Sequence, residues 1–239
     1  MLSVSERLRD PRQRAERAKR ILDVAADLLL LHGYRRVTID DVAARAGIGK
    51  GTVYLHWKTR EQLFGAVLTR EVGSAIDQVR QVLADDPQAC RLHRFARAYF
   101  LAIASRRLLL GFLLADPELL GKLTGSPDRE ERHVKMARGY LELLAEHGLL
   151  RDDLGLDQLG YAYQATFEGF LRAEGGAPED GREQRADLLA GTVLRAFESE
   201  AAPSDAALRD LATAVATLLG DVVDADRAEA GIPETAGDA

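Results

Sequence analysis

The spacing of apolar residues along the chain is the feature that most limits its possible folds. Over residues 12–32 one apolar stripe consists of Ile21, Leu22, Ala25, Leu28 and Leu29. Intervals of three and four residues place such side chains on one side of an α-helix, whereas strands require strict alternation. Hardly any segment alternates in that way, and hairpin turn signals are missing. The sequence therefore predicts an all-α protein.

Two short helices separated by glycines follow the first helix. Thr38 is a suitable N-cap for a helix over Ile39–Ala46, and Asp41 stands where the acid of a capping box belongs. Gly47 ends this helix, and a third helix is expected over Lys50–His56. Two short helices joined by a glycine turn behind a longer one predict a helix-turn-helix over about residues 37–56.

The third of these helices has a buried side and a polar side. Val53 and Trp57 are spaced to anchor it to the rest of the domain. The outward-facing residues are rich in hydrogen-bond donors, and they are Lys50, Gly51, Thr52, Tyr54 and His56. This polar side suits a DNA groove.

The charge distribution agrees with a polyanionic partner. Residues 1–60 hold 13 lysines and arginines against 7 acidic residues, while the whole chain has a formal net charge of -6. A cationic end attached to an acidic body indicates that the first part meets a polyanion. A merely solvated charged face would explain a smaller excess. The arginines before Arg20 can be read either as an arm that touches the minor groove or as a solubilising helix start.

Residues 20–64 resemble the TetR family of bacterial transcriptional regulators. The segment reads RILDVAADLLLLHGYRRVTIDDVAARAGIGKGTVYLHWKTREQLF, and its residues fall at the family's spacing. The resemblance implies that the third helix lies in the major groove, that the protein is a two-fold dimer, and that the C-terminal helices hold a ligand pocket.

Carried onto this sequence, the resemblance assigns DNA contacts to eight residues. Lys50 would read a base edge, and the backbone at Gly51 could approach a base. The resemblance implies phosphate contacts for Thr38, Tyr54, His56 and Arg60, and for Thr52 either a phosphate or a thymine methyl. Lys58 would add only charge.

The C-terminal helices, expected over residues 73–202, contain an aromatic stripe that is either plain core or the wall of a pocket. A pocket needs large apolar walls and a few polar groups. The candidate lining residues are His93, Phe95, Tyr99, Phe112, Met136, Tyr140, Tyr163, Gln164, Phe167 and Glu168.

Two helices expected over residues 156–173 and 182–199 look like the pair that the family uses for a four-helix bundle across the two-fold axis. The alternative is that their apolar faces pack within one protomer. The candidate interface residues are Leu159, Tyr163, Thr166, Phe170, Leu188, Leu189, Thr192, Val193 and Ala196.

The expected organisation thus starts with a basic tail over residues 1–11 and a DNA-binding domain over residues 12–72. The ligand-binding and dimerisation domain follows, and then an extra helix over residues 203–220. Residues 221–239 are expected to be a disordered tail.

The sequence favours a cytoplasmic dimeric repressor that a small-molecule effector releases from a double-stranded DNA operator. A protein-interaction or ligand-storing module is the alternative. The sequence shows no nucleophile with a base, no paired carboxylates, no phosphate-binding loop and no metal-ligand spacing. We therefore expect neither an enzyme nor a cofactor. The single cysteine, Cys90, is expected to be inert packing, and no apolar run is long enough for a membrane span.

Overall fold

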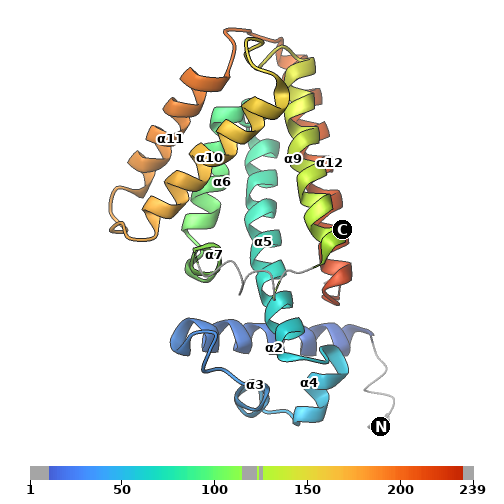
Figure 1. The fold of residues 1–239 in the computed structure, drawn as a ribbon. Helices are drawn as coiled ribbons and strands as arrows, with labels where there is room; N and C mark the ends of the chain where they lie inside the picture. Colours follow the sequence, from blue (N-terminus) through green and yellow to red (C-terminus); the bar gives the residue numbers. More distant parts are fainter. Residues whose placement is uncertain (1–10, 115–122, 124–125, 234–239) are drawn as a thin grey trace. The chain divides into compact units, whose positions relative to one another are not determined.

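The computed structural model describes residues 11–114, 123 and 126–233, which form two compact units (Figure 1). We call residues 1–71, 116–125 and 224–239 the head, and residues 72–115 and 126–223 the body. The elements are α2 (Pro11–His32), α3 (Ile39–Ala46), α4 (Lys50–His56), α5 (Arg60–Asp85), the 3₁₀ helix η1 (Pro87–Cys90), α6 (Leu92–Ala104), α7 (Arg107–Leu113), α9 (Pro127–Glu146), α10 (Leu156–Glu174), α11 (Arg182–Phe197) and α12 (Asp205–Glu229). The all-α prediction is confirmed, since the regular structure of the described residues is helical apart from one isolated bridge between Leu150 and Glu198.

Local signals determine both short helices of the head, which begin and end where the sequence predicts. The Thr38 hydroxyl accepts a hydrogen bond from the Asp41 amide at 3.2 Å, and the Asp41 carboxylate accepts from the Thr38 amide at 2.8 Å. These two bonds form the predicted capping box. Gly47 follows α3 with φ of 67°, a left-handed conformation that glycine adopts without steric cost.

The head packs around α2, which begins at Pro11, one residue earlier than predicted. Its side chains Ile21 and Leu22 are buried, as are Val53 and Trp57 from the α4 region. Arg70 of α5 donates to the Asp23 carboxylate at 2.6 Å and thereby ties α5 to α2. Because α2 is helical from Pro11 onward, the arginines at positions 12–20 belong to a helix, which favours the helix-start reading over an arm for that segment.

In the body, α6 packs along α11, and α10 packs against both (Figure 1). The connection between α10 and α11 is held by the buried carboxylate of Glu174. It accepts from Arg182 Nε at 3.1 Å and from Arg185 Nε at 2.5 Å. These charged hydrogen bonds, with that of Arg185 largest, outweigh the effect of burial and lower the pKa of Glu174.

A second buried carboxylate, Glu198, joins the end of α11 to the start of α6. The sequence suggests one helix over residues 88–106, but the structure divides it into η1 and α6. At the division Glu198 accepts from Arg91 Nε at 3.2 Å, from the His93 amide at 2.6 Å and from His93 Nδ1 at 2.8 Å. Nearby Cys90 is fully buried, and burial raises the pKa of its thiol to about 11, which fits the predicted inert role.

The C-terminal helix is longer than predicted. Residues 221–229, expected to belong to a disordered tail, are the last turns of α12. The reason is that the apolar stripe continues, with Leu219, Val222 and Val223 buried. Residues 1–10 and 234–239 of the predicted tails lie outside the described residues. In the described part of the chain, no helix combines the length and apolar character that crossing a bilayer requires.

Candidate functional site

The outer side of α4 presents the predicted base-reading residues. Lys50 and Gly51 are exposed, and Thr52 and Tyr54 are half-buried. Lys50 Nζ lies 5.9 Å from the centroid of the Tyr54 ring. It also donates to Asp40 Oδ2 of α3 at 2.8 Å, and this hydrogen bond raises the pKa of Lys50. The lysine is therefore charged, and it is held by a carboxylate that must release it before it can reach a base.

Because Asp40 competes with DNA for Lys50, we expect the Asp40→Asn variant to bind any duplex about two- to fivefold more tightly at low salt. Removing an acidic charge beside a phosphate-binding surface strengthens the electrostatic part of binding, and salt screens that gain. Fluorescence anisotropy at two salt concentrations measures the effect. Asp210→Asn removes the same charge from an exposed position on α12 and serves as the control. Equal gains from both variants would contradict the role of Asp40.

Thr38 is less available for a phosphate than predicted. Its hydroxyl donates to Asp41 Oδ2 at 2.7 Å, and its amide donates to the same oxygen. These hydrogen bonds lower the pKa of Asp41, so the start of α3 carries a permanent anion. A phosphate contact by Thr38 would have to break the capping box, and it stays a prediction that the geometry disfavours.

The side chains of His56 and Lys58 differ in their exposure and in the contacts that they already make. His56 is half-buried and stacks on Trp57 with ring centroids 5.4 Å apart. Burial, with Arg14 and Arg17 of α2 adding to it, lowers the pKa of His56. At neutral pH His56 would therefore act as an uncharged donor. Lys58 is exposed, although its Nζ donates to the Tyr54 carbonyl at 2.9 Å.

Arg60 has a task within the head that the sequence did not reveal. Its Nε donates to the Val37 carbonyl at 2.8 Å, and a second nitrogen donates to the Tyr34 carbonyl. The guanidinium also lies over the rings of Tyr34 and Phe64, 4.0 and 5.1 Å from their centroids. Arg60 therefore holds the segment before α3 in place, and its phosphate contact stays a prediction.

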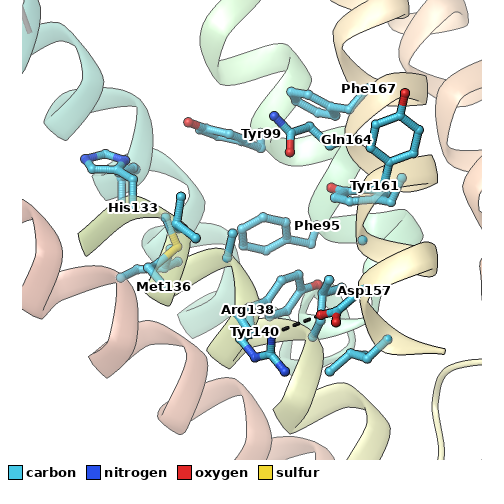
Figure 2. Close-up of a pocket in the computed structure, with 18 of the residues that line it drawn as sticks. Phe95, Tyr99, His133, Met136, Arg138, Tyr140, Asp157, Tyr161, Gln164 and Phe167 are labelled. Carbon is cyan, nitrogen blue, oxygen red and sulfur yellow. Dashed lines mark hydrogen bonds and ion pairs between the residues drawn. The ribbon is translucent and has the colours of Figure 1, made fainter. Parts of the chain in front are cut away.

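Within the body, a cavity of about 610 Å³ is bordered by α5, α6, α9, α10 and α12 (Figure 2). Its wall is mainly apolar, and six of its twenty lining residues are phenylalanines or tyrosines. The Tyr99 and Phe167 rings are stacked with centroids 5.6 Å apart, and the Phe95 and Tyr140 rings lie 4.5 Å apart. Burial raises the pKa of Tyr99 and Tyr140, so both phenols stay neutral. Volume and lining are typical of small-molecule sites.

Seven of the predicted pocket residues line this cavity, namely Phe95, Tyr99, Met136, Tyr140, Tyr163, Gln164 and Phe167. The other three do not. His93 is bound to Glu198, Phe112 is buried in α7, and Glu168 accepts a hydrogen bond from Gln164 Nε2 at 2.8 Å without reaching the cavity wall. Thirteen further lining residues were not predicted from the sequence, and Ile76, Val79, Tyr161 and Leu219 are among them.

Four acidic or basic side chains line the cavity, namely Glu130, His133, Arg138 and Asp157, and two of them are paired with each other. Arg138 donates to Asp157 at 2.9 Å, as the dashed line in Figure 2 shows, and also to Glu142 at 2.8 Å. The Tyr140 hydroxyl donates to the Cys90 carbonyl at 2.9 Å. A guest would therefore meet aromatic faces and an Arg138–Asp157 ion pair, with Glu130 and His133 also at the wall.

The structure separates the predicted interface residues into two groups. Leu159, Leu189 and Val193 are fully buried inside the protomer, so the alternative reading, packing within one chain, is correct for these three. Five others, Thr166, Phe170, Leu188, Thr192 and Ala196, remain at least partly exposed on α10 and α11. Tyr163 is partly exposed as well, but it borders the cavity.

Comparisons with known proteins place this architecture in a family. Residues 21–67 match the family model described as bacterial regulatory proteins, tetR family. Over 90 residues, 36% of this chain and 40% of the relative, the chain is 34% identical to the HTH-type transcriptional activator FasR of Mycolicibacterium smegmatis. Over 152 residues, 62% of this chain and 74% of the relative, it is 28% identical to the HTH-type transcriptional repressor KstR2 of the same species.

Solved structures agree on the fold. SmeT, the repressor of the Stenotrophomonas maltophilia multidrug efflux pump SmeDEF, superposes with a TM-score of 0.59 at 22% identity, covering 77% of this chain and 91% of SmeT. The match to FasR spans only about two fifths of that activator's length. Family model, relatives and fold agree in supporting the TetR family of DNA-binding transcription regulators, and the family model itself matches residues 21–67 of the chain.

Proposed function

We propose that the protein is a dimeric repressor that an uncharged, largely aromatic molecule releases from a near-palindromic operator. The observation that carries the DNA-binding part is the two-sided character of α4. Lys50, Gly51 and Tyr54 are accessible on it, whereas Val53 and Trp57 are buried behind them. A helix held from behind in this way can enter a major groove and present its polar side to base edges.

Two heads are needed for a palindrome, and helices α10 and α11 offer a surface for pairing. Leu188 of α11 is 62% exposed, although leucines of this size are usually buried, and Thr166 and Phe170 of α10 are partly exposed. An isologous interface would bring these helices against their copies and present two α4 helices to half-sites about 34–36 Å apart.

We expect Leu188→Glu to dissociate the dimer, because it would place a carboxylate in an apolar interface without a partner. Light scattering after gel filtration should report a dimer for the unmodified protein and a monomer for the variant. The variant's dimer association should be weaker by about tenfold or more. Leu154→Glu changes an exposed leucine outside both helices and serves as the control. A variant that stays dimeric would locate the interface elsewhere.

The cavity supports the effector part of the proposal. The stacked rings in the wall favour flat apolar molecules, and Arg138 already has a carboxylate partner in Asp157, so it does not require an anionic guest. Binding there would release the operator if the bound body favours a state in which the two heads no longer match the half-sites. A coupling of about 1–3 kcal/mol is sufficient for such a shift.

The environment-sensitive dye N-phenyl-1-naphthylamine, which is uncharged and apolar, tests the cavity. Ala137→Trp, at an exposed lining position, should fill the cavity and weaken dye binding, whereas Ala145→Trp on the same helix lies outside the lining and is the control. Dye binding that both variants leave unchanged would remove the cavity from the proposal.

Gel shifts on DNA from the gene's own upstream region test the regulatory function. Sequence-selective binding that weakens with salt is expected. The direction of regulation follows from a reporter gene, with KstR2 a repressor and FasR an activator among the relatives. A stoichiometric protein partner retained after Lys50 and Tyr54 are replaced would instead favour the interaction-module alternative.

A further inference from the structure

The only tryptophan of the chain joins α4, the proposed recognition helix, to the residues that follow α12. Trp57 is the C-cap of α4, and its side chain is 2% exposed. Its indole N–H donates to the carbonyl of Ala230 at 3.0 Å, across a sequence separation of 173 residues. Both residues belong to the head. This hydrogen bond is not needed to bury the ring, because a phenylalanine would fill much of the same space.

The acceptor carbonyl is prepared by the way α12 ends. The Gly231 amide donates to the Ala228 carbonyl at 3.2 Å, and the Ile232 amide donates to the Arg227 carbonyl at 3.0 Å. Together with φ of 64° at Gly231, these bonds form a Schellman motif. The motif satisfies two of the helix's last carbonyls, and the carbonyl of Ala230 at the cap is satisfied by Trp57.

The recognition helix has few buried side chains of its own to hold it. It is seven residues long, and Val53 is the one residue within it that is buried. A helix of this length is not stable by itself in water, so tertiary contacts must determine its position. Trp57 directly follows the helix and supplies the second anchor, and His56 stacks on the same ring.

We propose that the C-terminal end of α12, over residues 226–233, is a clamp that positions the recognition helix for operator reading through the Trp57–Ala230 hydrogen bond. Trp57 and Gly231 are thus positioning residues for DNA recognition. The inference rests on the proposed DNA-binding role of α4. Base contacts depend on placement of Lys50 and Gly51 more than phosphate contacts do, so the clamp should matter for specific binding more than for nonspecific binding.

The test compares two truncations of the full chain. One ends at Glu229 and removes the Ala230 carbonyl and the cap, and its matched control ends at Pro233 and retains both. An operator duplex selected in vitro with the unmodified protein and a scrambled duplex of equal length are compared by anisotropy. We expect the Glu229 truncation to lose about five- to tenfold in operator affinity, with the scrambled duplex changed less than about twofold.

Point variants separate the hydrogen bond from the bulk of the segment. Trp57→Phe keeps a ring but removes the donor, and it should reproduce most of the loss. Gly231→Val strains the left-handed cap, whereas Gly231→Asn tolerates that conformation and should bind like the unmodified protein. A β-carbon at position 231 would have no other atom within 4 Å, so a difference between these two variants reports backbone conformation.

Measurements without DNA test the clamp independently of the proposed DNA-binding function. Hydrogen exchange of the α4 amides should accelerate, and Trp57 emission should shift to the red, in the Glu229 truncation but not in the Pro233 truncation. If the unmodified protein shows no operator preference, the proposed function fails while these readouts still judge the clamp. If operator preference, exchange and emission all match between the truncations, the clamp does not exist.

Discussion

Replacing Lys50 with alanine is expected to remove much of the protein's preference for its own operator. Affinity for the operator should fall about ten- to a hundredfold, whereas affinity for scrambled DNA should fall less than about threefold. The reason is that Lys50 is an exposed charged donor on the outer side of α4, where a base edge can accept from it. Anisotropy with a series of single base-pair changes measures the effect, and one position should become permissive.

Tyr54→Phe is the informative comparison for Lys50→Ala. It removes only a hydroxyl from a half-buried ring beside Lys50, and without that hydroxyl's bond to a phosphate all duplexes should bind more weakly by a similar factor. Lys58→Ala is a second control, because the Lys58 ammonium is bonded to the Tyr54 carbonyl and is expected to contribute charge alone. If Lys50→Ala and Tyr54→Phe weaken every sequence equally, Lys50 does not read a base.

Replacing Glu198 with alanine is expected to cost about 3–5 kcal/mol of folding free energy. Its side chain is 0% exposed, and it accepts from Arg91 and from two nitrogens of His93, which are themselves mostly buried. The change would leave these donors without their acceptor at the junction of α6 and α11. Because a kilocalorie corresponds to about 2–4 °C in a protein of this size, thermal unfolding should shift down by roughly 6–20 °C.

Glu200→Ala, two residues away and exposed, is the control for the Glu198 prediction and should change stability by less than about 0.5 kcal/mol. Similar unfolding of the two variants would show that the Glu198 hydrogen bonds contribute little.

The same carboxylate predicts a pH dependence. Burial opposes its ionisation, but hydrogen bonds from His93 and the charges of His93 and Arg91 outweigh burial and lower the pKa of Glu198 below its ordinary value of 4.5. The folded state thus binds this proton less readily than the unfolded chain. The stabilisation is present above pH 4.5 and is lost as pH falls through the lowered pKa. The stability difference between the unmodified protein and Glu198→Gln should therefore narrow below pH 4.5.

Local chemistry explains why the helix-turn-helix could be predicted from sequence. Both ends of α3 depend on Thr38, Asp41 and Gly47, whose effects act within three or four residues. The aromatic lining of the cavity was also largely predictable, because Phe95 and Tyr99 repeat at helical spacing. Periodicity identifies a buried face, and a cavity wall is one kind of buried face.

Periodicity does not say which buried side chains meet each other. His93 was predicted to supply polarity to the pocket, and instead it is bound to Glu198, 105 residues away. Leu159 and Val193 have the spacing of interface residues, yet they are buried inside the protomer. In each case the same stripe of residues is compatible with several partners, and only packing selects one.

The sequence by itself determined the helical class and the helix-turn-helix and indicated the family, because each depends on residues that are close together in the chain. Only the tertiary structure decided that Arg60 supports the backbone before α3, that Asp40 holds Lys50, and that Trp57 donates to Ala230. These contacts join segments that are 10 to 173 residues apart. Their formation depends on how the helices pack, and no local pattern of residues shows which distant segments meet.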